Sequence, residues 1–275
     1  MSKGLRNLLR GSRVYLSGPM DFVASRAAER HTGWRARISE FLAHHGATVF
    51  DPWFKPAVKG LGPYGDEDEK STELREQLWS FSSGPAGARA REACAQQFYK
   101  TLHIDLRMVD LSDFVIGYVP STIYSVGTVH EIALARQQSK PVLLVSPRIE
   151  VEEIDRMQLL AQRHSEIAQT WLDLTSKIHI RDNPTGAPSI WYMGLVRSEC
   201  FFDHFGFAEH ASRRRWKPNP TLDDRENNPR NKRALLPFLE GLVRGTIPRR
   251  YDGARRKFVP DDDWLLMDKA RRPRQ

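Results

Sequence analysis

Short apolar runs alternate with stretches of helical periodicity along residues 1–146 of this chain. The run RVYLS, residues 13–17, is followed by a helical stretch over residues 25–45 and then by the run ATVFDPW, residues 47–53. Strand–helix–strand units of this kind form parallel sheets with right-handed crossovers. We therefore predict an α/β fold built on a doubly wound parallel sheet, Rossmann-like or flavodoxin-like.

The same alternation continues beyond one interruption. Residues 55–87 are rich in Gly, Pro, Ser and acidic residues and show no clear period, which indicates a functional lid or a mobile insertion. The further predicted elements are strands over residues 113–119 and 140–146, and helices over residues 88–110, 128–138 and 151–178.

The periodicity weakens beyond residue 180. We accordingly divide the chain into an α/β domain, residues 1–180, and a C-terminal basic extension, residues 181–275, whose role the sequence does not indicate. Residues 186–207 are apolar and aromatic enough to pack against the core or against another subunit. One short helix is expected over residues 234–243.

The basic character of the chain belongs to its last quarter. Residues 208–275 hold 18 Lys and Arg against 10 Asp and Glu, which accounts for the whole formal net charge of +8. The run Arg213-Arg214-Arg215 could contact phosphates of a nucleic acid. Arginine runs among prolines are more often solvated tails, so both interpretations stay open.

Composition indicates a cytoplasmic protein. The longest apolar runs, residues 114–119 and 141–145, are far too short to cross a bilayer, and the basic N-terminus lacks the apolar segment of a secretory signal. The two cysteines, Cys94 and Cys200, fit a reduced compartment better than a disulfide framework. No His, Cys or Asp set has metal-ligand spacing, and we expect no metal and no cofactor.

Three segments are expected to meet at the carboxyl edge of the sheet, where open parallel sheets bind their ligands. One follows the first strand, one follows the second, and the third is the loop over residues 120–127. Glycines there would let backbone amides approach a ligand, and helix N-termini favour anions such as phosphate. Trp53 could stack on a base or could equally be a core or lid aromatic. The predicted substrate-binding residues are Ser17, Gly18, Pro19, Met20, Trp53, Ser125, Gly127 and Thr128.

Glu131 has two interpretations. Thr128-Val-His-Glu131 fits a capping box, in which the glutamate would reach back to the amide of an N-cap threonine. In the first turn of its helix, Glu131 would also feel the positive end of the dipole and stay ionised. An ionised carboxylate at the rim of a crevice can act as a nucleophile, and its position favours this second role.

Three blocks of the sequence resemble the nucleoside 2-deoxyribosyltransferase superfamily, which includes the deoxynucleoside 5′-monophosphate N-glycosidases. The blocks are VYLSGPM, IDLRMVDLSDFVIGYV and SVGTVHEIALARQQSKPVLLV, and their order and spacing cover residues 13–147. Because the order of three blocks is shared, the resemblance is more specific than any one of them.

The resemblance implies roles for individual residues. Glu131 matches the nucleophile that attacks the anomeric carbon and forms a glycosyl-enzyme intermediate. Asp105 matches the carboxylate that helps the base to leave, and Tyr15 matches a tyrosine that hydrogen-bonds near the nucleophile. Ser125 stands where the transferases often carry a sugar-binding aspartate and the monophosphate glycosidases carry a serine. The family also implies a homodimer or higher homo-oligomer, in which a neighbouring subunit completes the pocket.

The function expected from this resemblance is cleavage or transfer at the N-glycosidic bond of a nucleoside or nucleoside 5′-monophosphate. Such a reaction uses a carboxylate close to the sugar and a proton source at the leaving base, as in retaining glycosidases. Two alternatives stay open: a non-catalytic nucleotide-binding or sensing module, and a DNA-associated protein that processes bases. The base, the sugar, and the choice between hydrolysis and transfer are not determined by the sequence.

Overall fold

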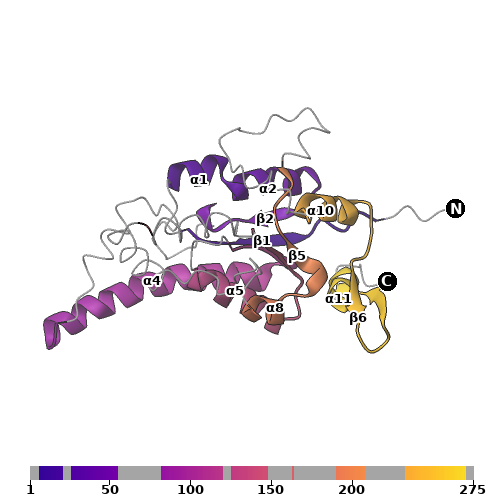
Figure 1. The fold of residues 1–275 in the computed structure, drawn as a ribbon. Coiled ribbons are helices and arrows are strands. Elements are labelled where there is room, and N and C mark those ends of the chain that lie inside the picture. The colour runs from indigo at the N-terminus through magenta and orange to yellow at the C-terminus, as the bar shows by residue number, and fades with distance from the viewer. Residues whose placement is uncertain are drawn as a thin grey trace.

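The chain folds around a five-stranded parallel sheet with the strand order β2-β1-β3-β4-β5 (Figure 1). The computed structural model describes residues 6–20, 26–54, 82–119, 125–147, 163, 190–207 and 233–270. Its parallel strands are β1 (Arg13–Ser17), β2 (Thr48–Phe50), β3 (Phe114–Tyr118), β4 (Val142–Val145) and β5 (Phe201–Phe202). This order is that of flavodoxin-like doubly wound sheets, so the predicted fold class is confirmed.

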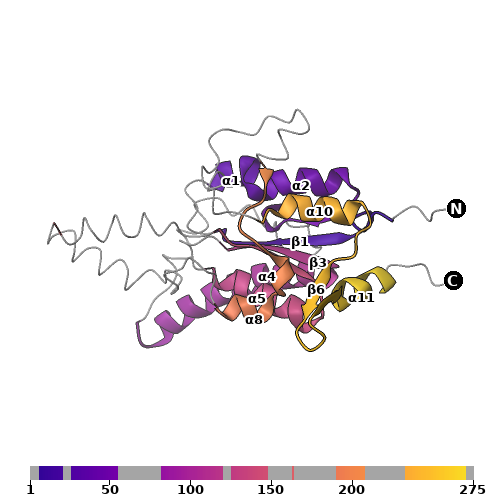
Figure 2. The ribbon, with the colours of Figure 1, turned by 45° about the vertical axis from the view of Figure 1, so that its right-hand side comes forward.

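Helices cover both faces of the sheet (Figures 1 and 2). One face carries α1 (Arg26–Thr32), α2 (Trp34–His44) and α10 (Leu235–Val243). The other carries α4 (Pro85–Leu111), α5 (Val126–Gln137) and α8 (Ile190–Leu195). The remaining elements are the short turns η1 (Pro52–Phe54) and η2 (Ser198–Cys200), the hairpin β6 (Arg249–Asp252) and β7 (Lys257–Pro260), and α11 (Asp262–Ala270).

The helix predicted over residues 25–45 is in fact two helices, which meet at Gly33. The Gly33 amide still donates to the Glu29 carbonyl at 3.0 Å, but its ψ of 178° is extended and starts α2 anew. A Cβ at this position would lie 2.3 Å from that same carbonyl oxygen. Only glycine therefore allows the close turn after which Trp34 and Arg35 enter the core.

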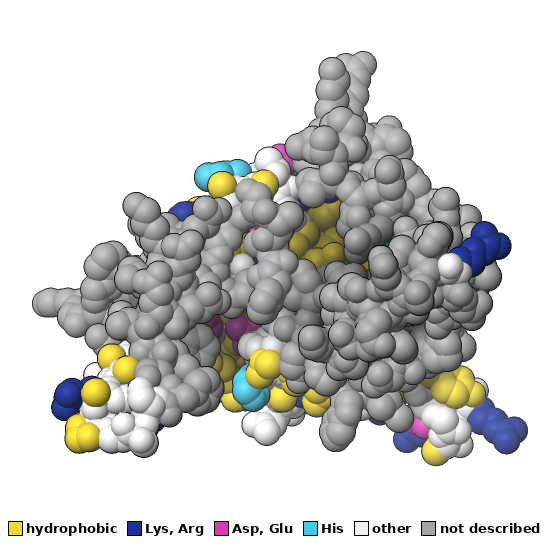
Figure 3. Space-filling model, turned by 60° about the vertical axis from the view of Figure 1, so that its left-hand side comes forward, with side chains coloured by type: hydrophobic (Ala, Val, Ile, Leu, Met, Phe, Trp, Pro, Cys, Tyr) yellow, Lys and Arg dark blue, Asp and Glu magenta, His cyan; other side chains and the backbone are white. Residues whose placement is uncertain are grey.

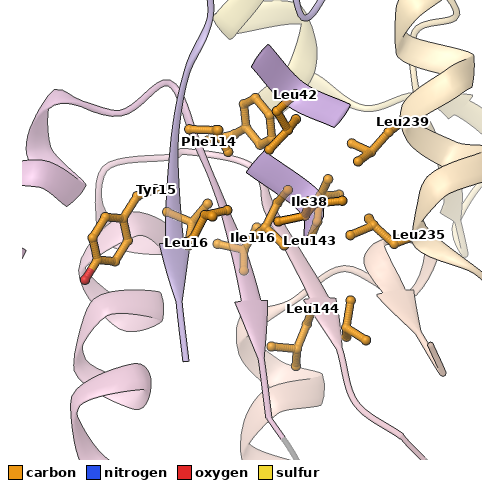
Figure 4. Packing of buried hydrophobic residues seen from close by; sticks show 14 of the residues in the cluster. Tyr15, Leu16, Ile38, Leu42, Phe114, Ile116, Leu143, Leu144, Leu235 and Leu239 are labelled. Carbon is orange, nitrogen blue, oxygen red and sulfur yellow. The ribbon is translucent and has the colours of Figure 1, made fainter. Parts of the chain in front are cut away.

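Strand β1 sends successive side chains to opposite sides of the sheet, as the pleat requires. Tyr15 extends to one side and Leu16 to the other (Figure 4). On the Leu16 side, the sheet is covered by the buried residues Ile38, Leu42, Leu235 and Leu239 from α2 and α10 (Figure 4).

Helix α5 packs against the sheet where β3 carries Gly117. A Cβ on Gly117 would lie 2.9 Å from a Leu144 methyl group and 3.2 Å from a methyl group of Ile132, which belongs to α5. A larger residue at this position would require the side chains of Leu144 and Ile132 to move. This close approach brings the other side chains of α5 within reach of β1.

Part of the C-terminal region belongs to the same sheet and core. β5 pairs with β4, and a bridge between His204 and Ala234 leads into α10. The Trp264 ring of α11 lies 5.5 Å from that of Phe114 in β3. The predicted packing of residues 186–207 against the core is confirmed for the described residues, of which Tyr192, Val196, Cys200, Phe202, Phe205 and Phe207 are buried. The division at residue 180 stays a prediction, although the sheet runs across it.

Other predicted features lie outside the described residues. These are residues 55–81 of the predicted insertion, the helix predicted over residues 151–178 apart from residue 163, and the run Arg213–Arg215. The β6–β7 hairpin was not predicted, although Asp252-Gly253 is a common hairpin turn sequence. In the parts of the chain that are described, no helix is both long and apolar enough to span a membrane.

Candidate active site

Glu131 points at the carboxyl end of β1. It is the sixth residue of α5, in the second turn, and is partly exposed. Tyr15 Oη donates a hydrogen bond to its Oε1 at 2.7 Å, and Ser17 Oγ donates to its Oε2. Both donors come from β1, on which Tyr15 and Ser17 share a face because they are two residues apart. Side chains of β1 therefore donate a hydrogen bond to each oxygen of the carboxylate.

The capping interpretation of Glu131 is wrong. The N-cap of α5 is Ser125, whose side chain accepts a hydrogen bond from the Thr128 amide. The cap therefore stands three residues earlier than the capping-box pattern places it. Glu131 lies too far along the helix to reach a cap amide, and its carboxylate is bound to β1 instead.

Burial raises the pKa of Glu131 from its ordinary value of 4.5 to about 7, and the negative charge of Asp105 adds to the rise. Hydrogen bonds from Ser17 and Tyr15 and the charge of Arg35 oppose it without cancelling it. The expectation that the helix dipole keeps Glu131 fully ionised is therefore wrong. A second-turn position weakens the dipole, and about half of the carboxyl groups hold a proton at pH 7.

Tyr15 is fully buried and stays a neutral phenol. Burial, and then the charges of Glu131 and Asp105, raise the pKa of Tyr15 well above 10. The phenol therefore keeps its proton and can only donate it in a hydrogen bond to the carboxylate. This agrees with the position that sequence analysis predicted for Tyr15, beside the proposed nucleophile.

Asp105 belongs to α4 and completes a three-element cluster. Its charge raises the pKa of both Glu131 and Tyr15, so it lies within electrostatic range of these two side chains of α5 and β1. Asp105 itself is partly exposed. Of the three predicted catalytic residues, Tyr15 and Glu131 are therefore in direct contact, and Asp105 acts on both through its charge; their catalytic roles stay predictions.

Arg35 binds the backbone at the end of β1, next to this cluster. It was not among the site residues predicted from the sequence. Its fully buried guanidinium donates to the carbonyl oxygens of Leu16, Gly18 and Pro19, at 3.3, 2.6 and 3.3 Å. Three backbone carbonyls of the segment that ends β1 are thus held by one side chain. A sequence signal existed, because Arg35 precedes Ile38 by three residues on the apolar face of α2.

Two carboxylates compensate the buried charge of Arg35. Glu29 lies 3.6 Å and Asp51 4.0 Å from the guanidinium. Burial raises the pKa of both acids, while the arginine lowers it. Asp51 also accepts a hydrogen bond from the Trp53 amide at 3.0 Å, which ties the end of β2 to the same group.

The remaining predicted ligand residues lie along this edge in different environments. Packing requires a glycine at position 18, because a Cβ on Gly18 would lie 2.8 Å from the Trp34 ring. Pro19 is buried and Met20 is partly exposed. Trp53 is only 2% exposed, as a core aromatic would be, and its stacking role stays a prediction.

The start of α5 forms the third side of the site. Ser125 Oγ lies 2.7 Å from the hydroxyl of Thr128, which is buried. Gly127 is exposed, and a Cβ there would meet no described atom within 4 Å. Packing within the described residues therefore does not require this glycine. Residues 120–124 of the predicted loop lie outside the described part of the chain.

These groups surround the switch point between β1 and β3, where the strand order of the sheet reverses. On one face of the molecule, an acidic side chain is recessed beneath its neighbours, near hydrophobic and histidine side chains (Figure 3). The described residues bring together no group of three His, Cys, Asp or Glu side chains able to hold a metal ion. The chemistry available to this cluster is that of carboxylates and hydroxyl groups.

Comparison with solved structures gives several likenesses, including the following two. A 2-deoxyribosyltransferase from the psychrotolerant bacterium Bacillus psychrosaccharolyticus is 20% identical over 50% of this chain and 75% of its own, with a TM-score of 0.27. A conserved protein from Enterococcus faecalis V583 is 17% identical over 68% of this chain and 86% of its own, with a TM-score of 0.32. No family model and no curated protein sequence matches the chain. Likenesses of this extent do not assign the chain to a family.

Proposed function

We propose that this protein cleaves or transfers at the N-glycosidic bond of a nucleoside or nucleoside 5′-monophosphate, with Glu131 as the nucleophile. The observation that carries the proposal is the Glu131 carboxylate, gripped by Tyr15 and Ser17 at the sheet's switch point with a second acid, Asp105, close by. Two neighbouring carboxyl groups are what a retaining glycosidase needs.

In the proposed reaction, a Glu131 oxygen forms a bond to the anomeric carbon of the sugar while the bond from that carbon to the base nitrogen breaks. Asp105, in its protonated form, gives the departing base its proton. Water, or a second base, then attacks the same carbon, gives its proton to the Asp105 carboxylate and releases Glu131, which gives hydrolysis or transfer. The atoms balance without a metal or a redox partner.

Tyr15 and Ser17 have a positioning role in this scheme. Their hydrogen bonds fix the rotamer of Glu131, so that the carboxylate need not be ordered when substrate binds. Burial also keeps the carboxylate poorly stabilised, with a pKa of about 7, and a more basic carboxylate is a better nucleophile once ionised.

A phosphate of the substrate would lie at the start of α5. The amides of its first turn lack helical partners, and the space beside Gly127 is open among the described atoms. Ser125, as the N-cap, offers a hydroxyl at the same point. This arrangement supports a nucleotide more than a nucleoside as the substrate.

The proposal is tested by incubating the protein with a panel of nucleosides and nucleoside monophosphates, with and without a second free base, and separating the products by chromatography. We expect free base or an exchanged nucleoside from the wild type. Glu131→Ala and Glu131→Gln should lower the rate by at least about a thousandfold, because the proposed glycosyl intermediate forms on this carboxylate.

Glu92→Gln is the matched control, since it makes the same chemical change on the exposed side of α4 and should leave the rate unchanged. Undiminished base release by a folded Glu131→Ala protein would refute the assignment. Binding of a nucleotide by calorimetry, without any product from the wild type, would instead favour a sensing module.

A further inference from the structure

The β6–β7 hairpin exposes two aromatic rings side by side. Tyr251 is 50% and Phe258 46% exposed, and their ring centroids are 5.4 Å apart. The two residues are directly opposite in the antiparallel pair, so both rings lie on one face of the hairpin. Two adjacent exposed rings form a small apolar patch, and such patches often mark interaction sites.

Positive charge surrounds these rings. The segment from 249 to 258 reads RRYDGARRKF, with five Lys and Arg and one Asp. Arg249 is exposed on the same face as the rings, since its partner position Pro260 follows Phe258 by two residues. Arg256 and Lys257 are exposed where the hairpin turns.

The acids near the hairpin neutralise only part of this charge, because arginines outside the hairpin already hold two of them. Asp263 is paired with Arg136 and Arg197, at 2.6 and 3.2 Å, from outside the hairpin. Asp261 is 1% exposed and lies 3.4 Å from Arg197.

The other two acids nearby, one exposed and one partly buried, each pair with one arginine of the hairpin. Asp262 pairs with Arg250 at 2.9 Å, and Asp252 with Arg255 at 3.6 Å. Three hairpin cations are left: Arg249, Arg256 and Lys257. Within the described part of the chain, none of them has a carboxylate within 4.0 Å.

We propose that the β6–β7 hairpin is a binding surface for single-stranded nucleic acid, with bases stacked on Tyr251 and Phe258 and phosphates bound by Arg249, Arg256 and Lys257. Aromatic faces accept any base, and the cations follow the backbone. A duplex hides its base faces and would use the cations alone. This surface is independent of the Glu131 site and of the function proposed for it.

Fluorescence anisotropy with labelled oligo-dT and oligo-rU of about 20 nucleotides tests the surface. We expect binding that weakens steeply between roughly 50 and 200 mM salt, and weaker binding of a duplex of equal length. Tyr251→Ala/Phe258→Ala should lower the affinity for single strands by about tenfold or more. Arg256→Gln/Lys257→Gln should lower the affinity and flatten the salt dependence by about two counterions.

Three control variants separate stacking from other effects. Tyr251→Leu/Phe258→Leu keeps apolar area without ring faces and should bind as weakly as the alanine pair. Tyr99→Ala, at a ring 61% exposed on α4, and Lys269→Gln, at an exposed cation of α11, should bind normally. Thermal melting confirms that each variant folds.

Several outcomes would overturn the proposal. These are no binding of any single strand by the wild type, unchanged binding by the alanine pair, full affinity in the leucine pair, or tighter binding of the duplex. Concentration-dependent self-association that the alanine pair abolishes, without oligonucleotide binding, would show that a second copy of the chain covers the rings instead.

Discussion

Helix α5 carries one acidic side chain, Glu131, and contacts another, Asp263 of α11. The two carboxylates have opposite electrostatic surroundings. Near the start of the helix, Glu131 meets two hydroxyl groups and another acid, and burial raises its pKa to about 7. Five residues further on, Arg136 lies 2.6 Å from Asp263 of α11, which Arg197 also contacts. Helix α5 therefore carries a destabilised carboxylate in its second turn and contacts a stabilised one, of α11, at its last turn.

The pKa of Asp263 shows the contrast directly. Burial by itself raises this pKa, but hydrogen bonds from Arg197 and Arg136 outweigh burial and lower it below its ordinary value. A buried acid that faces arginines is arranged for stability, since removing one partner of such a pair is costly. A buried acid that faces hydroxyls and a like charge costs stability, which is typical of groups that perform chemistry.

The largest expected effect of this difference is on the pH dependence of the proposed reaction. Because Glu131 must be ionised to attack, kcat/KM should rise about tenfold per pH unit from pH 5 up to the pKa of about 7, and it should fall again at the pH where Asp105 loses the proton that it gives to the base. The initial rate of base release, measured across this range, gives the midpoint of the rise. A midpoint near the ordinary glutamate pKa of 4.5 would contradict the electrostatic description of the site.

The next effect is on the free energy of unfolding. Asp263→Asn should lower it by about 2 kcal/mol at pH 7, because two arginines lose their shared carboxylate. Since the folded pKa of Asp263 is depressed, this stability is present above the unfolded value near 4 and is lost as the pH falls below it. Urea unfolding at pH 7 and pH 3 measures both quantities.

Asp262→Asn provides the control for that measurement. Asp262 is the sequence neighbour of Asp263, but its side chain is 59% exposed and pairs with Arg250 at the surface. Exposed ion pairs contribute about 0–1 kcal/mol, so this variant should unfold almost as the wild type does. Equal losses from the two variants would mean that the arginine cluster around Asp263 is no more stabilising than a surface pair.

The smallest effect should have the opposite sign. Glu131→Gln should raise the free energy of unfolding at pH 8 by about 1–2 kcal/mol, less than the full pKa shift allows because the side chain is partly exposed. The folded pKa of Glu131 is raised, so its favourable contribution exists below pH 4.5 and is lost as the pH rises through about 7. The gain should therefore vanish at pH 4. A variant less stable than the wild type at pH 8 would show that the hydrogen bonds from Tyr15 and Ser17 outweigh burial.

Several elements of the fold and of the candidate site could be predicted from the sequence. The strand before Gly18 and the helix carrying Glu131 were located from apolar runs and helical periodicity, which are local patterns. The break at Gly33 was missed, because a glycine inside an apolar periodic stretch does not by itself show a change of direction. Arg35 was missed as well, since arginine usually lies at the surface and only its spacing from Ile38 indicates otherwise.

The candidate site itself depended on longer-range contacts. The capping-box pattern predicted a local partner for Glu131, whereas its real partners are Tyr15 and Ser17, 116 and 114 positions away. Nothing in the local sequence states which of two helix starts is used, and the structure chooses Ser125. The same holds for Asp263, whose partner Arg136 is 127 positions away.

The sequence by itself determined the α/β class, the parallel sheet and the residues that carry reactive groups, because alternating burial leaves a periodic pattern in neighbouring positions. Only the tertiary structure decided which of these groups meet, and with what charge. The proton affinity of Glu131 comes from burial and from the charge of Asp105, which belongs to α4 on the same face of the sheet. The proton affinity of a side chain depends on its surroundings in the folded protein, so it cannot be predicted from a local stretch of sequence.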